Sequence, residues 1–417
     1  MMRVSIPYGQ RTLDCEVDPD RVLTPAGATR PPPSLPDPAA AVHAALEAPE
    51  GYPPLRRILT PDDHVAILVD EALPDLALLL TPILEVIVGA GVKAEAVTLL
   101  CPPSASNQPW LDDLPERFEE TRLEVHDPAD RNHLSYLATT KHGRRIYLNR
   151  TAVDADQLIL LTARRYDPHL GISGCEGALY PAVSDLATLQ ESGGRLSLDT
   201  PGREAWPARR ESAEVAWLLG APFAVQIIES AGDGIAHVLA GTVDASALGQ
   251  EQLDSRWRLS VPAQAETVVA AISGDPARHR FADLAAALAC ACRAVEPGGN
   301  IVLLTEANPA LGPGADLLRQ ADTPREALDA LDQHHPPDRA AAFLWATAAQ
   351  EASLYVLSAM PPETVEELFA TPLDDDRQVQ RLLRGQGPFL FIPDAHKAMV
   401  EVLPTPARGR KKVPHPA

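Results

Sequence analysis

Short apolar runs alternate along the chain with longer segments that carry apolar residues at helical spacing. The runs at 65–69, 96–100 and 158–162 consist mostly of Val, Ile, Leu and Ala, which is typical of strands buried on both faces of a sheet. Helices are expected at 39–48 and around 76–89, on either side of the first of these strands. This alternation predicts an α/β fold with a parallel, doubly wound sheet.

The same alternation starts again after residue 261. Four further strands are expected at 267–272, 301–305, 354–358 and 388–392, with helices at 282–295, 365–368 and 374–383. Glu296-Pro-Gly-Gly299 is expected to end the first of these helices. The sequence therefore predicts two α/β domains with mainly parallel sheets and a cleft between them. We place the first domain at 1–262, the second at 263–402 and a disordered basic tail at 403–417.

Four other segments of the first half predict strands or irregular structure. The segment 4–17 is expected to form a β-hairpin that turns at Gly9, and 137–149 a second β-ribbon. A further short strand is expected at 123–126. The proline-rich stretch 25–38 predicts a connector.

The chain is strongly acidic, with a formal net charge of −21 at pH 7. Such a charge repels nucleic acid and anionic membranes, so neither is an expected partner. The basic cluster at 408–412 could contact nucleic acid, but a solvated tail is the preferred interpretation. No apolar run approaches the roughly 20 residues of a membrane span, and the start of the sequence does not resemble a signal peptide. We therefore expect a cytoplasmic protein.

The segment 164–181 combines arginine, glycine, histidine and carboxylates directly after the predicted strand 158–162. Open α/β sheets place their ligands at the carboxyl ends of strands. Arg164, Arg165 and Tyr166 are therefore candidates for binding a small anionic metabolite, and Asp167 and His169 are candidates for moving protons. The alternative is a structural loop that an Asp–Arg pair braces.

Further candidates follow in the same segment and in the second half of the chain. Ser173 lies between glycines whose amides could add donors to an anion site. Glu176 could act as a general base, or it could cap the helix that follows. Cys175 lacks a neighbour that would activate it, so a buried, inert thiol is the preferred interpretation. His279 is a candidate contribution from the second domain.

Other patterns carry weaker signals. The five cysteines are scattered without a CxxC pair, which predicts reduced thiols and neither a disulfide framework nor a zinc site. Gly312-Pro-Gly314 matches neither nucleotide-binding glycine motif. The adjacent His334 and His335 lack a third ligand nearby, so they predict a surface loop.

Seven motifs occur in an order and at a spacing that resemble the nickel-pincer lactate racemase family. Their positions are the opening Ile6-Pro-Tyr-Gly-Gln-Arg-Thr12, Asp70 after the first buried strand, Gly171-Ile-Ser-Gly174 with Leu179-Tyr-Pro181, Ser273-Gly-Asp-Pro276, 297–302, 354–358 and 391–394. The resemblance implies a lactate racemase-like fold of two α/β domains. It covers most of the chain.

The same resemblance implies a site from which this chain departs. In the family, a loop lysine tethers a nickel-pincer nucleotide, a histidine ligates the metal, two histidines act as acid and base, and an arginine, a glutamine and a second lysine handle the substrate. Asp70 is retained, whereas the other positions fall at Gly177, about Gly193, Asp167, the segment 101–104, Leu73, Asp283 and Ala286. A glycine can neither tether a cofactor nor bind a metal, so we expect no nickel-pincer nucleotide and no metal site.

Together these observations predict a lactate racemase-like protein that binds a small hydroxy-acid or sugar-acid anion. If it is an enzyme, we expect an isomerase of the racemase or epimerase type that transfers protons without a metal through Asp70, Asp167, His169 and Glu176. Two alternatives stay open. One is a non-catalytic homologue that acts as a ligand-binding or protein-interaction scaffold, and the other is the lactate racemase that the resemblance itself implies. The sequence does not indicate an oligomeric state.

Overall fold

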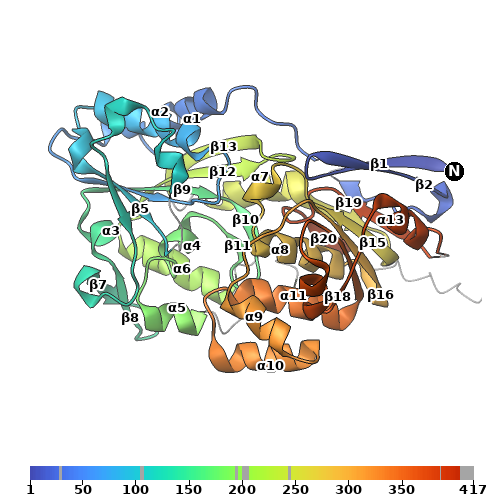
Figure 1. Ribbon diagram of the computed structural model, residues 1–417. Coiled ribbons are helices and arrows are strands. Elements are labelled where there is room, and N and C mark those ends of the chain that lie inside the picture. Colours follow the sequence, from blue (N-terminus) through green and yellow to red (C-terminus); the bar gives the residue numbers. More distant parts are fainter. Residues whose placement is uncertain are drawn as a thin grey trace, which may run out of the picture.

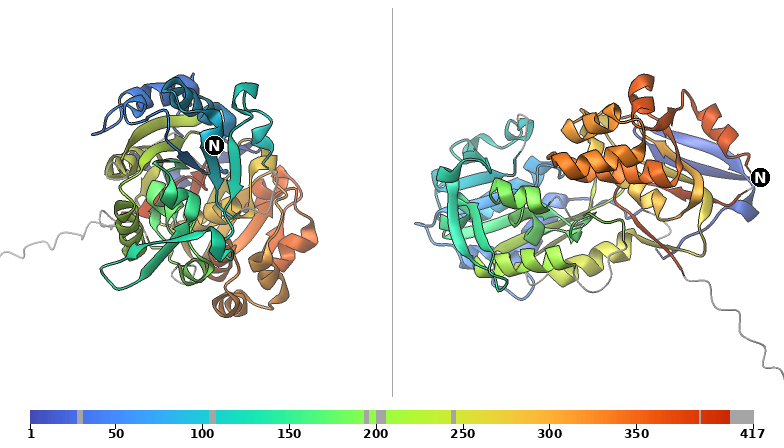
Figure 2. Two further views of the ribbon diagram at one scale, coloured as in Figure 1. Left: turned by 90° about the vertical axis from the view of Figure 1, so that its left-hand side faces the viewer. Right: turned by 90° about the horizontal axis from the view of Figure 1, so that it is seen from below.

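The computed structural model describes residues 1–27, 31–103, 108–192, 196–199, 206–242, 246–385 and 387–403 (Figure 1). The predicted basic tail lies outside these residues, apart from Leu403. Two separate sheets with helices on their faces form two halves of the molecule, which lie side by side in Figure 1 and in the right-hand view of Figure 2. Among the described residues, no helix is both long and apolar enough to cross a membrane.

The first half is built on a six-stranded sheet in the order β13-β12-β9-β4-β5-β6. All neighbouring pairs are parallel except β12 with β13. The strands are β4 (Val65–Val69), β5 (Val97–Cys101), β6 (Arg122–Val125), β9 (Gln157–Ala163), β12 (Phe223–Glu229) and β13 (Ile235–Thr242). The sheet therefore confirms the parallel arrangement that the apolar runs predicted.

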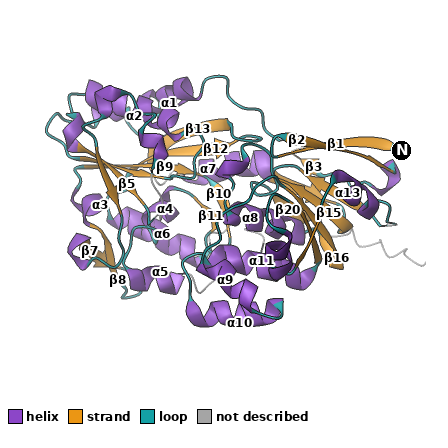
Figure 3. Cartoon of the chain, viewed as in Figure 1, coloured by secondary structure: helices purple, strands orange, loops and turns teal. Residues whose placement is uncertain are grey.

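Helices cover both faces of this sheet (Figure 3). Val65, Ile67 and Val69 pack with α1 (Pro38–Glu47) and α2 (Leu76–Gly89) in one apolar cluster. Ala66 and Leu68 point to the opposite face, because side chains alternate along a strand, and contribute to a second cluster. The helices on that second side are α3 (Arg150–Asp154), α4 (Cys175–Leu179) and α6 (Pro207–Leu218).

The second half is built on a five-stranded, fully parallel sheet in the order β18-β17-β16-β15-β19. Val268 and Ala270 of β15, the neighbour of edge strand β19, face the main cluster of this half, which includes residues of α8 (Phe281–Cys292) and α11 (Arg339–Glu351). The strands are β15 (Ala265–Ala271), β16 (Val295–Leu304), β17 (Ser353–Leu357), β18 (Ala370–Pro372) and β19 (Phe389–Ile392).

The predicted hairpin at 4–17 is present, as β1 (Met2–Tyr8) and β2 (Arg11–Val17), and it packs on this second sheet. Its buried side chains form one cluster with Val269, Val302 and Phe389. The hydroxyl of Tyr8 also donates to Asp376 Oδ1 at 2.7 Å. The start of the chain thus belongs in space to the second half, so we propose a division in which 1–27 joins the residues after 257. The division at 262 remains a prediction.

The remaining elements lie around these two sheets. The smaller sheets contain β3 (Ala26–Gly27), β14 (Arg258–Val261) and β20 (Met399–Val402), the ribbon β7 (Leu134–Thr139) with β8 (Arg145–Asn149), and the pair β10 (Arg165–Asp167) with β11 (Gly171–Ser173). The other helices are α5 (Leu186–Ser192), α7 (Ser246–Trp257), α9 (Pro313–Gln320), α10 (Pro324–His334), α12 (Pro362–Glu367) and α13 (Asp376–Leu382).

One prediction about the second half needs correction. The helix predicted at 282–295 ends at Cys292, and the segment 296–299, interpreted as its termination, lies inside strand β16. The register shifts there, and Gly298 has a φ of 74°, so the glycines form a bulge in a strand. Gly312-Pro-Gly314 begins helix α9, with Pro313 at its first turn, where the missing N–H costs nothing.

The hairpin packing is tested by replacing Leu13, whose side chain is buried between β2 and the second sheet. Leu13→Ala should lower the free energy of unfolding by about 2–5 kcal/mol, because it leaves a cavity in that interface. Thr12→Ala, on the exposed side of the same strand, should change it by less than about 0.5 kcal/mol. Urea titration followed by circular dichroism measures both. Equal effects would mean that the hairpin does not pack on the sheet in solution.

Candidate functional site

The charged groups that the fold brings together lie where the central strands of the first sheet end. Asp70 directly follows β4, Arg165 is the second residue after β9, and Glu229 is the last residue of β12. These three strands are neighbours and run parallel, so their carboxyl ends reach the same edge of the sheet. The three side chains form an ion-pair network, which we call the Arg165 site.

Arg165 is held between the two carboxylates. Its Nη1 donates to Asp70 Oδ2 at 2.8 Å, and its Nε donates to Glu229 Oε1 at 3.0 Å. Asp70 also accepts the backbone N–H of Ala163 at 3.1 Å, so this carboxylate is itself fixed in place. The Arg165 side chain retains 31% of its exposed surface. A guanidinium in this position is both oriented and accessible.

The second half of the chain contributes to the same network. Lys397, in the turn before β20, lies 3.3 Å from Glu229 Oε2 and donates to the carbonyl of Ser230 at 2.9 Å. The rings of His279 and His396 lie beside each other, with their centroids 6.0 Å apart. The site thus joins loops from both sheets.

The electrostatics of this site follow from burial and from its ion pairs. Burial alone would raise the pKa of Glu229, but Arg165 and Lys397 outweigh it and lower that pKa to about 2. Burial lowers the pKa of His396 to about 4, and Lys397 beside it acts in the same direction. Burial also lowers the pKa of His279. Both imidazoles are therefore neutral near pH 7, and Glu229 is ionised.

A second ionic cluster lies beneath the loop 171–181 and is almost completely removed from water. Glu176 Oε1 accepts from Arg164 Nη1 at 3.1 Å and from Arg209 Nε at 2.8 Å. Arg164 Nε also donates to Gln226 Oε1 at 3.0 Å. The side chains of Arg164 and Glu176 are 0% and 1% exposed. We call these three ionised residues the Glu176 triad.

Two glycines make room for this triad. A Cβ on Gly174 would overlap the guanidinium of Arg164, and one on Gly249 would overlap Gln226. Burial alone would raise the pKa of Glu176, but Arg164 and Arg209 lower it to about 2. Cys175 lies in the same cluster, and burial raises the pKa of its thiol to about 12, which agrees with the predicted inert thiol.

The structure gathers some of the predicted site residues and separates others. Asp70, Arg165 and His279 lie at or beside the Arg165 site, whereas Arg164 and Glu176 pair with each other inside the fold. The buried position of Arg164 does not fit a grip on a ligand, and Glu176 neither caps a helix nor faces a cleft.

The other predicted residues of this segment make local contacts. The hydroxyl of Tyr166 donates to Asp254 at 2.8 Å, and Asp167 accepts the backbone N–H groups of His169 and Leu170 at 2.8 and 2.7 Å. The carbonyl of Ser173 lies 3.4 Å from Arg164 Nη1. His169 lines a separate pocket of about 540 Å³ together with residues of α6. Their catalytic or binding roles stay predictions.

Sequence reasoning missed Glu229, Lys397 and His396 as members of the site. Glu229 ends a strand that the apolar pattern 223–228 could have indicated, since it follows an apolar run as Asp70 does. Nothing in the spacing places Lys397 and His396 near Arg165, because they are more than 230 positions away. Among the described residues, no group of three or more histidine, cysteine or carboxylate side chains is arranged to hold a metal ion.

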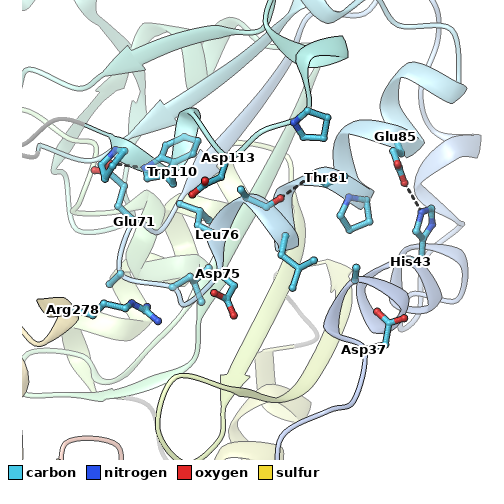
Figure 4. A pocket seen from close by; sticks show the side chains of 18 of the residues that line it. Asp37, His43, Glu71, Asp75, Leu76, Thr81, Glu85, Trp110, Asp113 and Arg278 are labelled. Atoms are coloured by element: carbon cyan, nitrogen blue, oxygen red, sulfur yellow. Dashed lines mark hydrogen bonds and ion pairs between the residues drawn. The ribbon is translucent and has the colours of Figure 1, made fainter. Parts of the chain in front are cut away.

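A groove of about 1020 Å³ opens next to Asp70 (Figure 4). It runs between α1 and α2, and Glu71, Leu73 and Trp110 form part of its wall. Trp110 Nε1 donates to Glu71 Oε1 at 3.3 Å. Arg278, from the second half, reaches the same groove, as Figure 4 shows. A second pocket of about 460 Å³ is lined by His279 and Glu306.

Comparison with known proteins gives a consistent picture. Residues 8–203 match the family model of the lactate racemase N-terminal domain. A curated lactate racemase from Thermoanaerobacterium thermosaccharolyticum is 21% identical over 431 positions, which cover 96% of this chain and 99% of the relative. These matches confirm the family resemblance inferred from the motifs.

Solved structures extend the comparison to the fold. The lactate racemase apoprotein from the same organism superimposes with a TM-score of 0.78 at 18% identity, over 96% of this chain and 100% of that one. A protein from Thermotoga maritima gives a TM-score of 0.64 at 11% identity, over 88% and 99%. The predicted α/β fold with mainly parallel sheets is confirmed.

The Glu176 triad makes a testable contribution to stability. Glu176→Gln should lower the free energy of unfolding by about 3–5 kcal/mol, because it leaves two arginines near or in the core without their counter-charge. Glu191→Gln, at an exposed ion pair with Arg144, is the matched control and should cost less than about 1 kcal/mol. Similar values for both variants, measured by urea unfolding at pH 7, would contradict a buried ionised triad.

The same carboxylate predicts a pH dependence. Its pKa in the folded state is about 2, below its ordinary value of 4.5, so the stabilisation is complete above pH 4.5 and disappears as the pH falls towards 2. The wild-type free energy of unfolding should therefore fall across this range more steeply than that of Glu176→Gln. Urea midpoints measured between pH 5 and pH 3 test this, and parallel pH profiles would rule it out.

Proposed function

Because the chain belongs to the lactate racemase family, we propose that it binds a small hydroxy-acid or sugar-acid anion at the Arg165 site. We further propose that it moves a proton on this ligand without a tethered nickel-pincer nucleotide, as an isomerase of the racemase or epimerase type. The observation that carries the proposal is Arg165 itself, an oriented and accessible cation where the central strands end. It lies beside the histidines and the lysine of the second half.

Arg165 is suited to bind a carboxylate. A guanidinium has five N–H donors. Nε and Nη1 of Arg165 each donate one hydrogen bond to the two carboxylates, and Nη2 lies 2.9 Å from Glu229 Oε1 in the same ion pair. Two donors therefore remain for a ligand on the exposed edge. The two protein carboxylates fix the plane of the guanidinium before a ligand arrives, which reduces the entropy lost on binding.

The neighbouring imidazoles are suited to accept a proton. Burial keeps His279 neutral near pH 7, and a neutral imidazole is a general base. His396, the ring beside it, is neutral as well before a ligand binds. In this proposal Asp70 orients Arg165 and does not transfer a proton. Asp167 and Glu176 have no role in the chemistry, because their oxygens are engaged with the backbone and with the buried arginines. His169 opens to another pocket.

The tether position does not fit the nickel-pincer nucleotide of the family. Gly177 lies in α4, where it is buried and supplies no amine. A Cβ at this position would overlap the side chain of Leu170, so the space next to it is filled. The residue before it, Glu176, is turned into the core. The position implied for the metal-binding histidine, about Gly193, lies outside the described residues.

Two other functions are supported by particular observations. The Glu176 triad uses the charged residues of the former cofactor loop as internal structure, which favours a non-catalytic scaffold that binds a ligand or a protein. The lactate racemase from T. thermosaccharolyticum aligns with 96% of this chain, which favours the activity in that protein's name. For the isomerase, the ligand-binding scaffold and the lactate racemase, the proposed partner is a small anionic metabolite.

Substitution of Arg165 tests the binding site. Titration calorimetry with D-lactate, L-lactate, D-glycerate and D-gluconate should find at least one ligand, and Arg165→Ala should weaken its binding by roughly tenfold or more. Arg165→Lys should weaken it less, because it keeps the charge and loses the planar fork. Arg56→Ala, at an exposed pair with Glu47, should bind as the wild type does. Unchanged binding by Arg165→Ala would refute the site.

A second experiment separates the proposal from the family activity. The protein is co-expressed with proteins that synthesise the nickel-pincer nucleotide, and its metal content and lactate racemisation are then measured. We expect no stoichiometric nickel and no interconversion of D- and L-lactate, because Gly177 cannot tether the nucleotide. One nickel per chain together with racemisation would favour the lactate racemase function instead.

A further inference from the structure

The charges around the Arg165 site do not balance. The ionised side chains that make up or adjoin it are three cations and four carboxylates, namely Arg165, Lys397 and Arg280 with Asp70, Glu229, Asp283 and Asp394. With both imidazoles neutral, this set carries one excess negative charge. An incoming anion would add a second negative charge in a half-buried position, where charges interact more strongly than in water.

The group that can relieve this imbalance lies beside the site. His396 follows Asp394 by two residues and precedes Lys397, and it interacts electrostatically with Glu229 and Asp283. Its Nδ1 is buried, and it has no hydrogen-bond partner among the described residues. His279, the neighbouring ring, is 7% exposed, and its Nδ1 is likewise buried without a partner there.

We propose that the anion bound at Arg165 is taken up together with one proton, and that this proton resides on His396. The ligand class is thus a monocarboxylate that enters as the equivalent of its neutral acid. This inference rests on the proposed function, since it concerns the same site. No bond other than an N–H bond is formed: the buffer gives up a proton, and an imidazole nitrogen of His396 receives it.

The groups facing His396 explain the direction of the effect. Burial and Lys397 oppose its protonation, whereas Asp394, Asp283 and Glu229 favour it, and the balance in the absence of ligand keeps the ring neutral. The carboxylate of a ligand bound at Arg165 adds a further negative charge, so it favours protonation of His396. His279 is affected by burial, by Lys397 and by the carboxylates Asp283 and Asp233. It lines the pocket of about 460 Å³, at the edge of the site, so it is the less affected ring.

Proton uptake is measured directly by calorimetry. The best-binding anion of D-lactate, L-lactate, D-glycerate and D-gluconate is titrated into the full chain at pH 6 in cacodylate and in imidazole, which differ in ionisation enthalpy. The difference between the two heats should correspond to about half a proton or more per bound anion, and the affinity should then fall by about threefold or more per pH unit around pH 6. Heats that do not depend on the buffer would overturn the proposal.

Variants assign the proton to one ring. His396→Asn should still bind the anion, more weakly, but without uptake and with a flat pH profile from 5 to 7. His64→Asn, at an exposed histidine directly before β4 and thus at the opposite end of that strand from Asp70, is the control and should behave as the wild type. Uptake that persists in His396→Asn, or that is lost only in His279→Asn, would overturn the assignment.

The failure of this inference can be told apart from the failure of the proposed function. Binding that depends on Arg165 but not on pH would support the proposed binding site and would contradict the coupled uptake of a proton. Binding by none of the four anions would overturn both. If His396→Asn does not fold, NMR titration of the imidazole signals of the wild type, with and without the anion, takes its place. An imidazole pKa that does not rise on binding would contradict the proposal.

Discussion

The buried carboxylate of Glu176 determines which charged side chains of the first half point into the core and which stay exposed. Glu176 is ionised in the core because Arg164 and Arg209 both reach it, and this pairing fixes the loop that carries it. Removing one partner from such a cluster leaves an unpaired buried charge, which is far costlier than the loss of a surface pair. Arg164 must therefore point inward. Arg165, the next residue along an extended chain, must point the opposite way, towards the second half.

Because of this constraint, two adjacent arginines have different roles: one stabilises the fold, and the other is available to a ligand. One arginine is completely buried and pairs with the loop, while the other keeps 31% of its surface and lies between Asp70 and Glu229. The sequence presents them as equivalent candidates. The same inward turn of Glu176 places Gly177 against Leu170, so the position that tethers a cofactor in the family is here part of a packed loop.

The elements that the sequence predicted well are those with a purely local signal. The strand at 65–69 and the helix at 76–89 have the predicted bounds, because their apolar spacing and their breakers lie within the segments themselves. The helices α10 and α11 and the strands β12 and β13 were not predicted, although their sequences contain apolar patterns. The segment 296–299 was assigned to a helix end because Pro-Gly-Gly is a strong stop signal, yet a bulge accepts the same residues.

The candidate site could be predicted only in part, since its contacts join residues far apart in the sequence. Asp70 and Arg165 were recognisable because each follows an apolar strand, but their pairing depends on the order of strands in the sheet. Lys397 and His396 reach the site through the turn before β20, which no local pattern reveals. The charge of the site also depends on residues that are far apart in the sequence. A chain with a net charge of −21 repels anions overall, so an anion site requires cations that the fold gathers from both halves. The four carboxylates gathered with them leave the site one positive charge short, and this shortfall makes a titratable imidazole in the site chemically useful.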